Sequence, residues 1–93
     1  MSYFVVTYDL VDRRNYKRIE DGLHAVSAGQ CQKILESVWV VKTSYSKATD
    51  VRDFLNKYID SDDKLFVIGT GESVTPWAST RVDKEATNWL KRQ

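Results

Sequence analysis

The sequence predicts an α+β protein with a ferredoxin-like arrangement, in which a four-stranded antiparallel sheet carries two helices on one face and is followed by a C-terminal tail. Runs of β-branched and aromatic residues alternate with runs whose apolar residues recur every three or four positions. Their order along the chain is strand, helix, strand, strand, helix, strand. The 93 residues are expected to form one domain, with its core in residues 2–69 and the tail in residues 72–93.

The first strand covers residues 3–10 and is β-branched or aromatic at nearly every position until Asp9. Because it is apolar at both alternating sets of positions, we expect it to be central and covered on both faces. A polar connector follows, in which Asp12 or Asn15 could cap a helix. That helix is expected to end near Gly29, which suits a left-handed C-cap. Its apolar stripe consists of Tyr16, Ile19, Leu23 and Val26.

Two further strands are expected at residues 31–35 and 37–43, with a tight turn near Glu36. One long bent strand is the alternative, because no glycine or proline separates the two runs. Ser46 is expected to cap the second helix. The apolar stripe of that helix consists of Ala48, Val51, Leu55, Tyr58 and Ile59.

The last predicted strand, residues 64–68, follows an acidic turn at residues 60–63. Pro76 cannot lie inside a paired strand, and residues 82–91 are expected to form a short final helix. This arrangement leaves one sheet face with apolar side chains, drawn from Tyr3, Val5 and Trp39. Such a face is expected either to join two copies of the chain or to be covered by the tail.

Composition and charge exclude several classes of protein. Hydrophobic residues make up 42% and charged residues 29%, as in an ordinary globular domain. The net charge of +1 excludes a strongly basic nucleic-acid binder, so such binding would need a local patch. The only cysteine, Cys31, excludes an intramolecular disulfide and favours a reducing compartment. No apolar run reaches the roughly 18 residues of a membrane span, and no secretory signal is recognised. The protein is therefore expected in the cytoplasm, with no membrane partner.

Familiar metal and nucleotide motifs fail in this sequence. The turn at residues 60–63 resembles the start of a calcium loop, but Leu65 stands where such a loop needs glycine and Gly71 where it needs glutamate. Residues 69–71 lack the rest of a dinucleotide or phosphate-binding fingerprint. His24 is the only histidine, which excludes a histidine-rich zinc site in one chain.

The strongest candidate for chemistry is the end of the first strand. Asp9 follows Tyr8 there, and basic residues come shortly after it. They are Arg13, Arg14, Lys17 and Arg18. A carboxylate that could hold a divalent cation, beside arginines that could hold phosphate oxygens, is typical of a phosphodiester site. One carboxylate holds magnesium poorly, so a two-fold homodimer would have to bring two Asp9 side chains together. The alternative is that Asp9 accepts hydrogen bonds from the connector in an Asx-type turn.

The pattern as a whole resembles the CRISPR-associated protein 2 family. The resemblance rests on residues 5–10, the arginines after them, the Ser37-Val38-Trp39 segment and the Asp62-Asp63 turn before residues 65–68. It spans roughly residues 2–68. The chain also resembles small proteins labelled SinR-like, in its Thr-Tyr-Asp-Leu, Ser-Val-Trp-Val-Val and Trp-Leu-Lys segments. The VapD toxins share the fold that this resemblance implies.

This resemblance implies a ferredoxin-like homodimer with one of two roles. One is an endonuclease that uses Mg²⁺ or Mn²⁺ to cut RNA or DNA. The other is a structural bridge beside an integrase partner protein. Carried onto this sequence, Asp9 becomes the metal ligand and catalytic residue, with Tyr8 beside it. The candidate contacts to nucleic acid are Arg13, Arg14, Lys17 and Ser37. The family's exchanged C-terminal strand has no clear counterpart in residues 72–93. A non-catalytic scaffold and a toxin-like module therefore stay open as alternatives.

Overall fold

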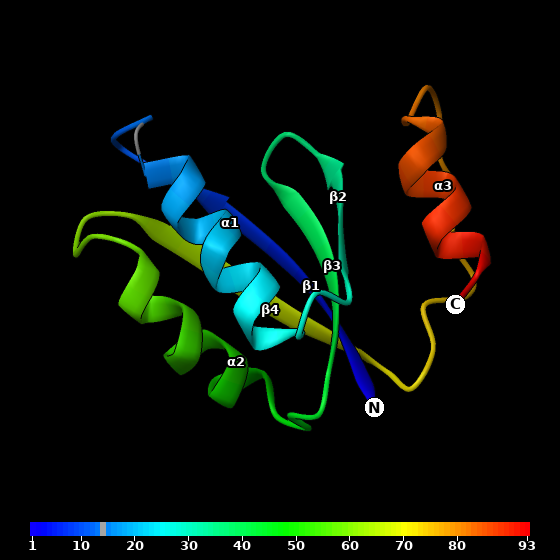
Figure 1. Ribbon diagram of the computed structural model, residues 1–93, viewed down its shortest axis with the longest axis horizontal. Helices are drawn as coiled ribbons and strands as arrows, with labels where there is room; N and C mark the ends of the chain where they lie inside the picture. The colour runs from blue at the N-terminus through cyan, green and yellow to red at the C-terminus, as the bar shows by residue number, and fades with distance from the viewer. Residues whose placement is uncertain (14) are drawn as a thin grey trace.

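The computed structural model describes residues 1–13 and 15–93 of the chain (Figure 1). Arg14, one of the residues predicted to contact nucleic acid, lies outside the described residues. The described residues form an α+β fold with a four-stranded antiparallel sheet and three helices. In chain order the elements are β1 (Ser2–Asp9), α1 (Asn15–Val26), β2 (Cys31–Leu35), β3 (Val38–Thr43), α2 (Ala48–Leu55), a 3-10 helix η1 (Asn56–Tyr58), β4 (Lys64–Gly71) and α3 (Lys84–Lys91).

The predicted order of elements is confirmed. β2 and β3 are separate strands joined by a turn at Glu36 and Ser37, and not one long bent strand. The final helix is present as α3. Gly29 has a φ of 82°, and its N–H donates to the carbonyl of His24 at 2.8 Å, so the first helix ends as expected.

The strands lie in the order β2-β3-β1-β4, and every neighbouring pair is antiparallel. β1 is central, as predicted from its apolar sequence. Val5, in its middle, lies between Val40 of β3 and Ile68 of β4. The two edges of the sheet are therefore β2 and β4.

Successive side chains of β1 point to opposite faces of the sheet. Phe4, Val6 and Tyr8 point toward α1 and α2, which lie together on one side of the sheet (Figure 1). These side chains join the main core. Its members with almost no exposed surface are Val6, Ile19, Leu23, Val41, Val51 and Leu55. The two predicted helical stripes therefore pack against the same face of the sheet.

The sheet face away from α1 and α2, called the open face below, is covered only in part. Tyr3 and Val40 are buried there, in one cluster with Leu90 of α3, and Trp77 and Trp89 pack against them. The tail thus covers part of this face, which was one of the two predicted alternatives.

The part of the open face that lies along β4 is not covered. Phe66 is 60% exposed and Ile68 is 51% exposed, although both are large and apolar. α3 contacts β2, at the opposite edge of the sheet. In Figure 1 it lies on the far side of β2 from β4. An apolar strip therefore remains along one edge of the molecule.

Two expectations about individual residues are wrong. Trp39 does not lie on the open face, because its register partner in β1 is Val6, which points toward the helices. Ser46 does not cap α2. The N-cap position is Lys47, and no side-chain hydrogen bond is made there.

The helices of the described residues are short, and α1 has 12 residues. Within residues 1–13 and 15–93, none is long and apolar enough to cross a membrane.

Candidate functional site

The C-terminal end of β1 is held between two other segments. On one side, the Tyr8 N–H donates to the carbonyl of Ser37 at 3.2 Å, in the turn between β2 and β3. On the other side, Asp9 stands directly opposite Lys64, the first residue of β4. The structure therefore brings Ser37 to the end of β1, and it adds Lys64, which the sequence did not indicate.

The side chains of Tyr8 and Asp9 lie on opposite faces of the sheet, because they are neighbours in one strand. Tyr8 is buried in the main core, where its Oη accepts a hydrogen bond from Trp39 Nε1 at 3.0 Å. Its ring also meets that of Tyr16 edge to face, with the centroids 5.8 Å apart. Burial raises the pKa of Tyr8 to about 12. The side chain of Tyr8 therefore serves the packing of the fold and lies on the other face of the sheet from the Asp9 carboxylate.

Asp9 is exposed on the open face. It lines a shallow depression of about 200 Å³ together with Thr7, Tyr8, Lys64, Leu65 and Phe66. Within the residues that the structure describes, its carboxylate has no hydrogen bond and no ion pair. The Asx-type turn proposed as the alternative role of Asp9 is thus not formed by these residues.

Asp63, and not Asp9, accepts hydrogen bonds from the backbone near the end of β1. Its carboxylate accepts the N–H of Val11 at 2.9 Å and the N–H of Asp60 at 2.8 Å, and Asn15 Nδ2 approaches it at 3.5 Å. The bonds from the backbone of Val11 and Asp60 lower the pKa of Asp63. This acidic turn ties the connector after β1 to the start of β4, and so fixes the surroundings of Asp9.

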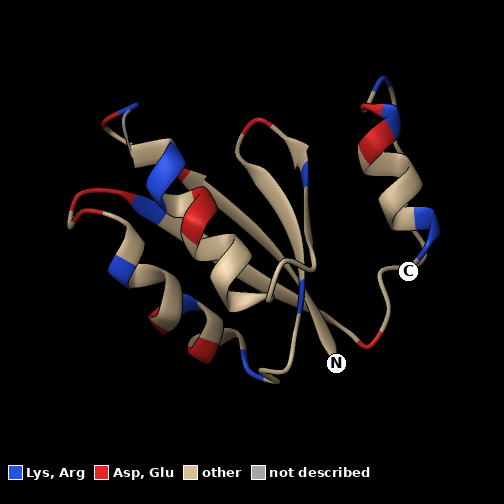
Figure 2. Cartoon of the chain, in the orientation of Figure 1, with Lys and Arg blue, Asp and Glu red and all other residues tan. Residues whose placement is uncertain are grey.

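The predicted basic residues are not all available to a ligand. Lys17 forms an exposed ion pair with Asp21, one helical turn further on. Arg18 pairs with Asp60, with Nη1 and Oδ1 3.3 Å apart, and also donates to a backbone carbonyl. Arg13 is exposed in the connector. Figure 2 shows that acidic residues line the connector into β4, which itself begins with a basic residue. The charges near the site are thus mixed.

Within the described residues, the depression at Asp9 offers a Mg²⁺ or Mn²⁺ ion a single carboxylate. Magnesium takes near-octahedral oxygen coordination and usually keeps several waters beside one or two carboxylates. Among the described residues, no group of three or more His, Cys, Asp or Glu side chains is placed to hold a metal ion. Asp9 alone would supply one carboxylate.

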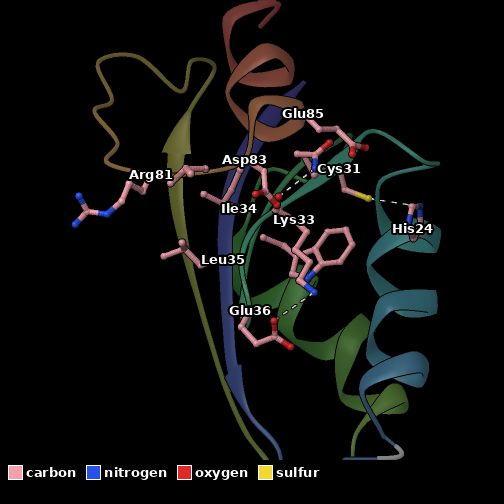
Figure 3. A pocket seen from close by; sticks show the side chains of 12 residues that line it. His24, Cys31, Lys33, Ile34, Leu35, Glu36, Arg81, Asp83 and Glu85 are labelled. Atoms are coloured by element: carbon pink, nitrogen blue, oxygen red, sulfur yellow. Dashed lines mark hydrogen bonds and ion pairs between the residues drawn. The ribbon is translucent and has the colours of Figure 1, made fainter.

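A larger cleft of about 560 Å³ lies at the other edge of the sheet, beside β2 (Figure 3). On its wall, Cys31 Sγ and His24 Nδ1 are 3.6 Å apart. Burial raises the pKa of the Cys31 thiol, which disfavours the reactive thiolate. Arg81 points away from this pair in Figure 3. Cys31 is a buried member of the main core, so its placement serves packing.

No family model matches the sequence, and no curated protein matches it. The resemblance to CRISPR-associated protein 2 therefore stays a prediction.

Asp63→Ala is expected to lower the melting temperature by roughly 4–8 °C, the shift that a loss of about 1 kcal/mol causes in a domain of this size. The reason is that the N–H groups of Val11 and Asp60 lose their acceptor. Asp62→Ala, at the exposed neighbouring position, is the matched control and should change it by less than about 2 °C.

The effect of Asp63→Ala should depend on pH. Because folding lowers the pKa of Asp63, its stabilisation is full above the unfolded carboxyl pKa of about 3.9 and is lost as the pH falls through the lower folded value. Thermal unfolding followed by circular dichroism, at neutral pH and at about pH 2.5, measures both values. An equal loss at both pH values, or an equal loss in Asp62→Ala, would contradict this role.

Proposed function

We propose that this chain is a homodimeric nucleic-acid-associated protein, similar in kind to CRISPR-associated protein 2, and that it works in the cytoplasm. The strand order supports a ferredoxin-like fold. β1 and β2 are joined through α1 and flank β3, while β3 and β4 are joined through α2 and flank β1. Two strand–helix–strand units that each enclose a strand of the other make up this arrangement.

The observation that carries the proposal is the pair of Asp9 and Lys64. They stand opposite each other at one end of the open face, both are exposed, and neither has a side-chain hydrogen bond or ion pair within the described part of the chain. Charged side chains that do not hold the fold together are available to a ligand. A lysine at such a place binds phosphate oxygens, and the exposed Arg13 in the adjoining connector adds a second positive charge.

A second candidate function is a metal-dependent endonuclease. Asp9 shares its depression with the exposed Phe66, so a second copy that packs on the open face would approach the carboxylate. Because one carboxylate holds the ion poorly, this function calls for a second Asp9 at the same place. A non-catalytic scaffold does not require the two Asp9 side chains to come together. The placement of Asp9 and Lys64 is equally compatible with a scaffold that only binds nucleic acid. A toxin-like module, the third alternative, would arrest growth when the protein is expressed.

Lys64→Gln is expected to weaken binding to labelled single-stranded RNA or DNA, because one contact to phosphate is lost. Fluorescence anisotropy at several salt concentrations measures this, and the salt slope should fall by about 1. Lys47→Gln is the matched control, since Lys47 is exposed at the N-cap of α2 and no hydrogen bond or ion pair of its side chain is found in the described chain. A wild-type protein that binds neither nucleic acid, or a Lys64→Gln variant with an unchanged slope, would overturn the proposal.

Asp9→Asn separates the two candidate functions. The substitution removes the negative charge and should leave stability unchanged, because the carboxylate makes no bond within the described residues. Wild type and variant are incubated with labelled RNA and DNA, with Mg²⁺, with Mn²⁺ and with a chelator. Cleavage that needs the ion and is lost in Asp9→Asn would establish the endonuclease. Binding without cleavage would favour the scaffold, and cleavage that survives the substitution would exclude Asp9 from the reaction.

A further inference from the structure

We propose that two copies of this chain join through the outer edges of their β4 strands, antiparallel about a two-fold axis at Val67, so that their two sheets become one continuous sheet. This inference names the interface of the homodimer proposed above and rests on it in that respect.

The backbone groups on the outer edge of β4 follow from the pairing of β1. Tyr8 donates its N–H toward β3, so in β1 the even residues bond to β3 and the odd residues bond to β4. Thr7 and Val5 stand opposite Phe66 and Ile68, whose backbone groups are therefore used by β1. The N–H and C=O groups of the alternate residues point away from the sheet. These are Leu65, Val67 and Gly69.

Within the described residues, the features that commonly protect an edge strand are found only at the two ends of β4. Natural edges are shortened, charged, bulged or broken by proline. β4 has eight residues and no proline, and its one charged residue, Lys64, stands at its start. The irregularity in its pairing lies only at its far end, opposite Tyr3 and Phe4. Within the described residues no strand pairs with this edge. The other edge, β2, has five residues and is contacted by α3. The unprotected edge is therefore that of β4.

The exposed side chains of β4 are complementary to themselves about Val67. With the axis there, Phe66 of each copy faces Ile68 of the other on the open face. These are the two residues that are 60% and 51% exposed in one chain. Apolar side chains directly opposite each other in an antiparallel pair stabilise it. The pairing thus covers the apolar strip that α3 leaves exposed.

The charges of β4 favour the same register. Lys64 of each copy faces Thr70 of the other, so no like charges stand opposite each other between residues 64 and 70. An axis at Phe66 would instead set Lys64 against Ile68 and place a charge in the apolar strip. The backbone agrees with an axis at Val67, because Leu65, Val67 and Gly69 then meet Gly69, Val67 and Leu65 as hydrogen-bonded pairs.

This interface keeps the two Asp9 side chains apart. Asp9 lies beside Lys64, and in the dimer the two Lys64 residues stand six positions apart along the strands. At about 3.4 Å per residue this separates the two ends by roughly 20 Å. A dimer formed at this edge therefore has two separate Asp9–Lys64 sites, one at each end, and no metal ion shared between them.

Disulfide formation tests the interface and its register. In a Cys31→Ser background, which removes the only native thiol, Val67→Cys places two thiols on the axis, with Cα atoms about 5.5 Å apart. Leu65→Cys is the matched control on the same edge and the same face. Its two Cα atoms would be roughly 13 Å apart, beyond the limit of about 7 Å for a disulfide. Under mild oxidation, Val67→Cys is expected to form the linked dimer at least about tenfold faster than Leu65→Cys.

A second pair of variants guards against misfolding, because Val67 also packs against the main core. Phe66→Cys and Ile68→Cys alter only exposed side chains. When mixed, they are expected to form the mixed disulfide in preference to either self-linked product. Sedimentation velocity of the unmodified chain gives its oligomeric state, with 10.8 kDa for one copy.

The outcomes separate this inference from the proposed function. Fast linking of Val67→Cys together with the mixed disulfide supports the edge interface, whether or not nucleic acid binds. A dimer that links Leu65→Cys as fast as Val67→Cys, or that links neither, overturns the interface and leaves the homodimer standing. A chain that sediments as one copy at every concentration overturns both.

Discussion

The arrangement of this protein depends on a central strand that is packed on both faces. In β1, Phe4, Val6 and Tyr8 face the helices, while Tyr3 is buried beneath the tail. Because side chains alternate strictly along a strand, a slip of one residue would exchange the two sets. The burial of Tyr8 therefore obliges Asp9 to lie on the open face. The placement of the candidate site follows from packing before any ligand is considered.

The open face of the sheet is covered only in part. The tail reaches Tyr3 and Val40 through Leu90, at the side of the sheet near β2. It leaves Phe66 and Ile68 of β4 exposed. A second copy paired at the edge of β4 would cover Phe66 and Ile68, which the tail of the same chain leaves exposed. In the proposed dimer, the Asp9–Lys64 sites lie at the two ends of the shared strand pair.

The sequence predicts those features that depend on neighbours along the chain. The helical stripes and Gly29 are read correctly because the periodicity and the left-handed cap are local. Features set by distant pairing are missed. Trp39 faces the helices because of its register with β1, and no local pattern reveals that register. The start of α2 is likewise missed, since Lys47 and not Ser46 occupies the N-cap position and makes no side-chain hydrogen bond there.

In the candidate site, too, the sequence predicts the features set by neighbouring residues and misses those set by distant pairing. Asp9 is found because it ends an apolar strand, whereas Lys64 is missed because only the pairing of β1 with β4 brings it opposite. The sequence predicts Asp63 only as part of a turn, yet its carboxylate accepts the hydrogen bonds expected of Asp9, because the fold brings it to the connector after β1. One pattern in the sequence does indicate Lys64. Lys64, Phe66 and Ile68 stand at every second position, which places a lysine at the end of a row of apolar side chains on one face of the sheet.

The claim that two copies of the chain pair through the outer edges of their β4 strands is tested most directly by amide hydrogen exchange at several protein concentrations. Val67 has an outward N–H, while the N–H of Phe66 lies in the ladder with β1. The account predicts that exchange at Phe66 is slow at every concentration and that exchange at Val67 slows as the concentration rises. Exchange at Val67 that stays as fast as that of an unbonded amide in a concentrated, folded sample would contradict it.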